Sequence, residues 1–192
     1  MTSIEKRRIN NLNYPIIKDI EIDKQILNKV NNRIYEDILC FNEIVQTEDE
    51  NIEFALTEYE VNLNKNKIIS ISIEFSQLAG ICEITYINTY NYDLSKGKEL
   101  DIDSIFNENT NYLKKINGEI QEKINEIIKK QDEFYINIDK EQSFYIKEDK
   151  IVICFSSYEL GDRFQYPIEI NIMFKDYKNY LDNYVLSNIY KI

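Results

Sequence analysis

Residues 69–76 alternate without a break between apolar and polar side chains. The apolar set is Ile69, Ile71, Ile73 and Phe75, and the polar set is Ser70, Ser72, Glu74 and Ser76. A period of two is typical of an antiparallel strand that buries one face and leaves the other face polar. This run therefore predicts an antiparallel sheet with one side turned to the core.

Two long helices are predicted, over about 23–45 and about 111–130. In each, apolar residues recur three or four positions apart, as on the buried face of an amphipathic helix. The stripes are Ile26, Val30, Ile34, Ile38, Phe41 and Val45 in the first helix, and Leu113, Ile116, Ile120, Ile124 and Ile127 in the second. Because both stripes are needed for the core, neither helix is a strong candidate for binding a partner helix.

Shorter elements complete the chain. Strands are predicted at 13–17, 52–63, 82–92, 134–138, 142–146, 151–155 and 168–174, and a short helix at 174–181. Inside 52–63 the apolar residues change from even to odd positions, which indicates a β-bulge or a bend. The order is then β-α-βββ-α-ββββ-α, which predicts an α+β fold with antiparallel sheets packed by two long helices.

The length of 192 residues suits one domain of ordinary size. No shift in composition marks a linker, so we expect a single compact α+β unit over 1–192. Two lobes, at about 10–100 and 101–182, are an open alternative. Residues 183–192 are predicted to form a tail.

Composition excludes several classes of function. The chain has no histidine, and 34 acidic against 23 basic residues give a formal net charge of −11. Ser-His-Asp and Cys-His catalysis and histidine-containing zinc or di-iron sites are therefore ruled out. Nucleic-acid binding needs clustered Lys and Arg, so the charge argues against that partner. P-loop, Gly-x-Gly-x-x-Gly and Gly-x-Ser-x-Gly motifs are missing, and we expect no cofactor and no metal.

Targeting signals are weak. No apolar run approaches the ~18 residues that cross a bilayer. Lys6, Arg7 and Arg8 resemble the start of a signal peptide, but no apolar segment follows them. As given, the chain is expected to be cytoplasmic and not inserted in a membrane, unless a leader belongs in front of it. The oligomeric state stays open.

The polar and aromatic segment 157–167 is a candidate site. Its notable residues are Tyr158, Glu159, Asp162 and Arg163. Loops placed by a rigid scaffold often carry function. Glu159 and Asp162 are thus a candidate acid–base pair, and an ordinary surface loop is the alternative.

Two smaller groups have both a structural and a functional interpretation. Tyr86, Tyr90 and Tyr92 share one face of a predicted strand, as core residues or as a recognition surface. Asp101 and Asp103 form an Asp-x-Asp pair that fits a cation site or, more commonly, the cap of a short turn.

The three cysteines, Cys40, Cys82 and Cys154, are far apart in the sequence and have apolar neighbours. Their odd number and the lack of a Cys-x-x-Cys pair argue against a disulfide framework or a zinc site. We expect all three to be small buried side chains.

Several segments resemble a known bacterial domain. They are Tyr-Asn-Tyr-Asp-Leu-Ser-Lys-Gly-Lys-Glu-Leu at 90–100, Asp-Ser-Ile-Phe at 103–106, Tyr-Leu at 112–113, Phe-Tyr-Ile at 144–146, Ile-Val-Ile-Cys-Phe at 151–155 and Tyr-Glu at 158–159. Over roughly residues 13–181 the chain resembles the extracytoplasmic domain of lysozyme-sensing anti-sigma factors. The same domain accompanies the catalytic domain of some peptidoglycan deacetylases.

One segment departs from the family pattern. Members usually carry Gly-Gly-Ala-His-Gly between the second and third strands, where this chain has Ala79, Gly80, Ile81, Cys82 and Glu83. The missing histidine corresponds to Cys82. The predicted partner-binding residues are Ala79, Gly80, Cys82, Glu83 and Tyr86, together with Tyr158, Glu159, Asp162 and Arg163 of the later loop.

The resemblance implies a non-catalytic binding or sensing module outside the membrane, with a protein or a cell-wall component as partner. In the anti-sigma factors that partner is lysozyme, a strongly cationic protein, and an acidic surface would suit it. Two other hypotheses stay open. One is a hydrolase that uses carboxylates alone, and the other is a cytoplasmic regulatory or structural protein that has lost the family's ligand.

Overall fold

The computed structural model describes residues 2–47, 52–128 and 135–190, with only the backbone described at residues 47, 52, 53 and 79. Its first layer is a six-stranded sheet in which the strands follow chain order. The strands are β1 (Ser3–Ile9), β2 (Leu12–Lys18), β3 (Ile52–Lys65), β4 (Ile68–Ala79), β5 (Cys82–Asp93) and β6 (Lys98–Glu99). Neighbours are antiparallel except β2 and β3, which run parallel.

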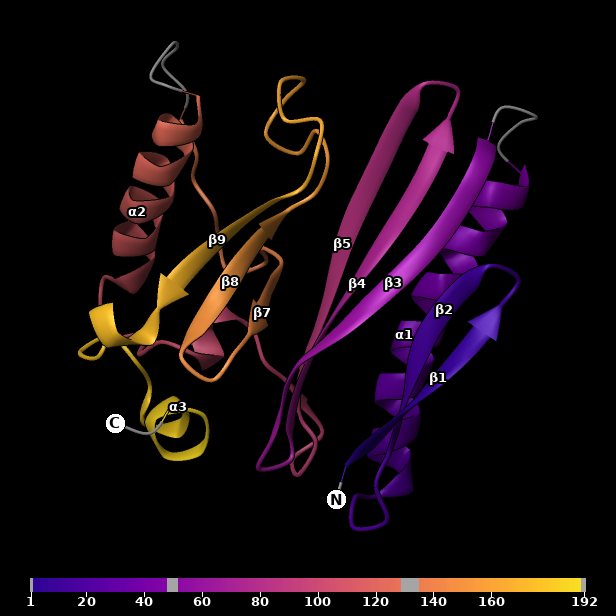
Figure 1. Cartoon of the computed structure of the whole chain (residues 1–192). Helices are drawn as coiled ribbons and strands as arrows, with labels where there is room; N and C mark the ends of the chain where they lie inside the picture. Colours follow the sequence, from indigo (N-terminus) through magenta and orange to yellow (C-terminus); the bar gives the residue numbers. More distant parts are fainter. Residues whose placement is uncertain (1, 48–51, 129–134, 191–192) are drawn as a thin grey trace.

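The helix α1 (Lys24–Thr47) lies along one face of this sheet (Figure 1). The predicted stripe is confirmed, since Val30, Ile34 and Ile38 are fully buried. They pack in one cluster with Ile71 and Ile73, which are the apolar positions of β4. The strict alternation in β4 thus reflects a strand with a helix on one face.

The residue pattern does not predict β1, because four charged residues in a row break the alternation. These are Glu5, Lys6, Arg7 and Arg8. The strand forms by pairing with β2 along its whole length, from Ser3 opposite Lys18 to Ile9 opposite Leu12. Backbone pairing holds it in the sheet, helped by Ile4 and Ile9, which pack partly against the cluster under α1. Backbone pairing leaves no sequence period.

A bulge in β3 is confirmed, but its predicted position is wrong. The change of parity falls between Leu56 and Tyr59, where the pairing with β4 is regular. The pairing with β4 shifts by one residue between Val61 and Leu63, and again between Ile52 and Phe54. The turn that joins the two strands places Asn66 and Lys67 at positive φ values of 52° and 61°. Two consecutive residues with positive φ are typical of a tight hairpin turn.

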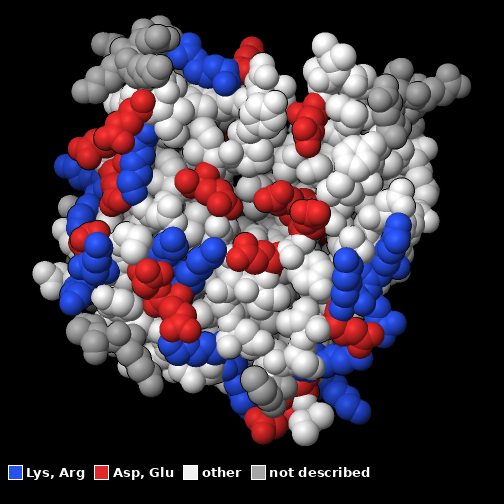
Figure 2. Space-filling view, in the orientation of Figure 1, with Lys and Arg blue, Asp and Glu red and all other residues white. Residues whose placement is uncertain are grey.

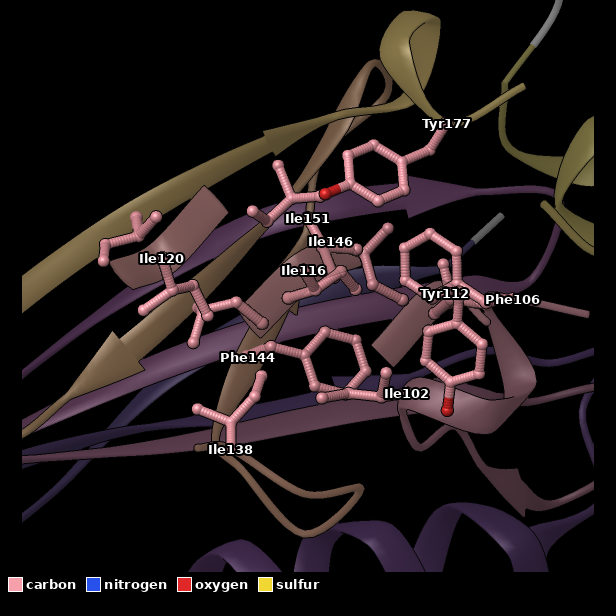
Figure 3. Close-up of a cluster of buried hydrophobic side chains, with 14 of the residues drawn as sticks. Ile102, Phe106, Tyr112, Ile116, Ile120, Ile138, Phe144, Ile146, Ile151 and Tyr177 are labelled. Atoms are coloured by element: carbon pink, nitrogen blue, oxygen red, sulfur yellow. The ribbon is translucent and has the colours of Figure 1, made fainter. Parts of the chain in front are cut away.

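A second, three-stranded antiparallel sheet consists of β7 (Phe144–Ile146), β8 (Lys150–Phe155) and β9 (Ile168–Met173). The helix α2 (Tyr112–Ile127) packs on it and forms a separate hydrophobic cluster. Figure 3 shows Ile116 and Ile120 of this helix beside Ile146 and Ile151 of the sheet. The predicted strand 151–155 is thus confirmed as a strand buried on both faces.

The strand predicted at 134–138 is wrong for the residues that are described. Ile136 and Ile138 are buried, as the alternation predicts, but 135–138 is not a strand. The backbone N–H groups of these two residues donate to side-chain oxygens of α2, to Gln121 at 2.9 Å and to Asn117 at 2.7 Å. Residue 134 and the predicted helix end at 130 lie outside the described residues.

The C-terminal prediction also needs correction. The predicted helix 174–181 is reduced to a short 3-10 turn, η2 (Phe174–Asp176), and the predicted tail contains the helix α3 (Asn183–Asn188). Asp182 caps this helix by accepting a hydrogen bond from the backbone N–H of Tyr184 at 2.8 Å. Val185 and Ile189 anchor it in the second cluster, where both are fully buried.

Side chains of the six-stranded sheet join it to the edge strand β7. The amide of Asn91 donates to the carbonyl oxygen of Phe144 at 2.7 Å. The hydroxyl of Ser70 donates to Asn91 at 2.6 Å and accepts from the backbone N–H of Ile146 at 2.8 Å. Backbone groups on the open edge of β7, which would otherwise be buried without partners, are satisfied in this way.

The α+β fold class is confirmed, with two helix-packed sheets and a third, short helix. The observed order adds β1, the two-residue β6 and α3 to the prediction and lacks the strand at 135–138. Within the described residues, no helix is both long and apolar enough to cross a membrane.

Candidate functional site

The first predicted segment is the turn between β4 and β5. Gly80 takes a positive φ of 61°, and Ile81 beside it is 99 % exposed. Cys82 and Glu83 are exposed as well, and nothing is described of the Ala79 side chain. The turn therefore presents its side chains to solvent, as a recognition element would.

The second predicted segment, the loop between β8 and β9, starts on the open edge of β5. Ser157 exchanges two hydrogen bonds with the backbone of Thr85, at 2.9 and 3.1 Å, and the Ser156 hydroxyl accepts from the N–H of Ile87 at 3.1 Å. Figure 1 shows this loop and the β4–β5 turn at the same end of the molecule. We call this end, defined by residues 80–83 and 156–167, the hairpin end.

Glu159 has one structural partner in its own loop and another just before β7. Its carboxylate accepts from the backbone N–H of Ser156 at 2.7 Å and from the side chain of Gln142 at 2.9 Å. Asp162 is exposed at the tip of the loop, as is Arg163. General acid–base catalysis needs groups that converge on a shielded site, so this arrangement gives no support to the predicted acid–base pair.

Tyr158 closes the loop through its backbone. It adopts a φ of 63°, and its N–H donates to the carbonyl of Phe164 at 2.7 Å. Phe164 is buried in the second cluster and holds the loop against the sheet. The loop is thus a built structure with its charged residues outside.

The tyrosines of β5 divide between the two interpretations. Tyr90 and Tyr92 are each 2 % exposed and belong to the core under α1. Tyr86 is 44 % exposed on the same face, nearer the hairpin end. Burial, then the contact with Glu99, raises the pKa of Tyr92 to about 12.

Asp101 and Asp103 act as turn residues. Asp101 accepts from the backbone N–H and the hydroxyl of Ser104, at 2.8 and 2.6 Å, and Asp103 accepts from the hydroxyl of Tyr112. The capping alternative is therefore confirmed. No group of three or more potential metal ligands occurs in the part of the chain that is described.

The prediction of three buried cysteines is wrong for two of them. Cys154 is buried, but Cys40 and Cys82 are exposed. Cys82 starts β5 beside an exposed turn, and Cys40 lies off the apolar stripe of α1. Apolar sequence neighbours do not decide burial at such positions, because adjacent side chains point in different directions.

The polar face of the six-stranded sheet carries a group that the residue pattern does not single out. Glu58, Glu60 and Glu74 lie on this sheet, and Glu169 of β9 in the second sheet lies close enough to repel Glu74. We call these four residues the glutamate cluster. Glu58 of β3 lies directly opposite Glu74 of β4 in the pairing register. Figure 2 shows acidic side chains gathered over the middle of the face between the two sheets.

The cluster is electrostatically strained. Burial of part of its side chain, followed by repulsion from Glu169, Glu58 and Glu60, raises the pKa of Glu74 above the ordinary value of 4.5. Within the described ranges, one ion pair reaches these four carboxylates, from Lys147 to Glu60 at 3.6 Å. Like charges placed directly opposite each other destabilise a strand pair, so the cluster is unfavourable for the isolated chain.

Comparison with known proteins gives a family match for part of the chain. Residues 103–175 match the family described as "Protein of unknown function (DUF3298)". The comparison with curated proteins finds no match.

Two solved structures are similar over nearly the whole length. A DUF3298 family protein from Pseudomonas aeruginosa has a TM-score of 0.64 at 10 % identity, over 96 % of this chain and 94 % of that one. A member of the same family from Bacteroides fragilis has a TM-score of 0.61 at 13 % identity, over 97 % and 94 %. At these identities the likeness establishes the fold. The chain thus has the fold of two DUF3298 proteins and matches that family over residues 103–175.

Proposed function

We propose that the chain is a non-catalytic binding module whose partner is a basic protein. The observation that carries this proposal is the glutamate cluster, in which Glu58 and Glu74 face each other across two strands. Positive side chains of a partner would offset the repulsion between these carboxylates. The net charge of −11 would also steer such a partner towards the chain.

The hairpin end would add apolar contacts. Ile81 is 99 % exposed in the β4–β5 turn, and Tyr166 is 69 % exposed in the neighbouring loop. Exposed apolar and aromatic side chains often dominate the binding energy of protein interfaces. Charge for steering and a few apolar anchors for affinity together suit a protein partner better than a small sugar.

Lysozyme is the first candidate for this partner, because the resemblance to lysozyme-sensing anti-sigma factors points to it. The same resemblance would place the chain outside the membrane. Finding the protein in the cell-surface fraction would support this location, whereas a wholly cytoplasmic protein would fit the alternative in which the ligand has been lost.

Calorimetric titration of the chain with lysozyme tests the proposal. We expect binding with a micromolar or tighter dissociation constant at low ionic strength, weakened by added salt. Cytochrome c, a basic protein of another fold, and soluble peptidoglycan fragments serve as comparisons. No heat with either basic protein, or binding to the peptidoglycan fragments alone, would overturn the proposal.

The raised pKa of Glu74 predicts how this binding depends on pH. Because the pKa of Glu74 lies above the ordinary glutamate value of 4.5, this side chain takes up a proton earlier than an ordinary glutamate as the pH falls. Lysozyme affinity should drop about fivefold between neutral pH and the pH at which Glu74 is protonated. Over the same range the protonation relieves repulsion, so the contribution of Glu74 to folding stability becomes more favourable. The variant Glu74→Gln should show a flatter pH profile of binding, and an unchanged profile would contradict this assignment.

A further inference from the structure

A cavity of about 380 Å³ opens between α1 and the outer half of β4 and β5. Phe75 and Gln77 line it, and they alternate along β4 with Glu74, so the cavity and the glutamate cluster lie on opposite faces of the sheet. Its volume lies in the usual range for small-molecule sites. A ligand bound in this cavity would therefore not contact the glutamate cluster that carries the proposed function.

The side-chain oxygen of Gln77 accepts no hydrogen bond from the described residues. The residue is 8 % exposed, and this oxygen, Oε1, is buried. A buried polar atom left unpaired is costly, and native proteins seldom keep one without a reason. A ligand that brings an N–H or O–H group into the cavity would satisfy this oxygen.

A carboxylate lines the other end of the cavity. Asp37 of α1 accepts from the hydroxyl of Tyr90 at 2.8 Å and from the amide of Asn88 at 3.3 Å. Its ion pair with Arg33 is long, at 3.5 Å, and the Arg33 side chain is 58 % exposed while that of Asp37 is 17 % exposed. The negative charge is thus turned inward and only loosely compensated, which leaves it able to attract a second cation.

Aromatic rings occupy the space between these two groups. Phe75 of β4 and Tyr86 of β5 lie opposite each other in the paired strands. Gln77 follows Phe75 by two residues on the same face, and Asn88 follows Tyr86 by two residues on the same face. Phe41 of α1 packs edge-on against Phe75, with ring centroids 5.3 Å apart. The centre of the cavity therefore favours a flat aromatic body, and ring faces also attract cations.

We propose that this cavity binds a small aromatic amine with a hydrogen-bond donor at the end opposite to its ammonium group. The ammonium group lies at Asp37, the ring lies against Phe75 and Tyr86, and the distal donor reaches Oε1 of Gln77. Each part of the ligand then meets a lining group of matching chemistry.

Three probes separate these contributions in calorimetric or NMR titrations. Tyramine has both the ammonium group and a distal hydroxyl, phenethylamine lacks the hydroxyl, and hydroxyphenylacetate carries a carboxylate in place of the ammonium. We expect tyramine to bind about tenfold more tightly than phenethylamine, because of these two amines only tyramine has a hydroxyl that can donate to Gln77. Hydroxyphenylacetate should not bind, because it would bring a second negative charge to Asp37.

The variant Gln77→Leu tests the role of the buried amide. It removes the unpaired oxygen, so the protein should fold at least as well, but the tenfold preference for tyramine should disappear. Gln165→Leu changes an exposed glutamine outside the cavity and should leave the preference intact. A preference that persists in Gln77→Leu would overturn the assignment.

The two exposed cysteines locate the binding site within the unmodified chain. Cys40 lines the cavity, whereas Cys82 lies at the β4–β5 turn. Tyramine should slow the alkylation of Cys40 by N-ethylmaleimide and leave the alkylation of Cys82 unchanged. Mass spectrometry measures both rates. Unprotected Cys40 at millimolar tyramine, or equal protection by hydroxyphenylacetate, would refute the proposal.

Discussion

Replacing Asn91 with alanine is expected to lower the free energy of unfolding by about 2–5 kcal/mol. Asn91 is 3 % exposed and supplies both a donor to the Phe144 carbonyl and an acceptor for the Ser70 hydroxyl. Its truncation leaves both of these groups buried and unpaired at the junction of the two sheets. Urea unfolding followed by circular dichroism would measure the loss.

A matched control lies on the same strand. Thr89 projects from the same face of β5 two residues earlier, and Thr89→Ala should cost only about 0.5 kcal/mol. The double variant Ser70→Ala/Asn91→Ala should lose less than the sum of its single variants, because they share one network. Equal losses for Asn91→Ala and Thr89→Ala would show that the network contributes little.

Reversing one charge in the glutamate cluster is expected to reduce lysozyme affinity about 30-fold or more. In Glu74→Lys the new cation faces Glu58, so the repulsive strand pair becomes an attractive one. The chain itself should therefore gain about 0.2–1 kcal/mol of stability while it loses its partner. Calorimetric titration and thermal unfolding of the same preparation would measure both effects.

The control for this variant is a charge reversal far from the cluster. Glu122 is exposed on α2, which packs on the second sheet, and Glu122→Lys makes the same change in net charge. It should reduce affinity only slightly, through weaker long-range attraction. If both variants lost affinity equally, net charge rather than the cluster would explain the binding.

Local patterns predicted the main elements well where one face of an element meets a core. The stripe in α1 and the alternation in β4 are of this kind, because a period of 3.6 or 2 directly reflects which side is buried. Local patterns do not predict segments whose backbone groups find hydrogen-bond partners elsewhere, because such partners leave no periodic pattern in the sequence. β1 is held by pairing with β2, and the N–H groups of Ile136 and Ile138 are satisfied by side chains of α2.

The candidate sites were less predictable. The turn at 80–83 and the loop at 156–167 stand out as exposed, aromatic or charged segments, but the anchoring of that loop through Ser156 and Ser157 depends on the open edge of β5. Gln77 looks like any polar residue at the end of a strand. Its importance comes from α1, which buries it without supplying a donor.

By itself, the sequence determined the fold class, the two long helices and the presence of a bulge in β3, since each follows from local spacing. The position of the bulge was decided by tertiary structure. Pairing from Lys65 opposite Ile68 without a shift would set Tyr59 against Glu74, whereas the one-residue shift after Leu63 sets Glu58 there. A register shift of one residue exchanges the faces of every side chain beyond it, and only the packing of both faces selects that register.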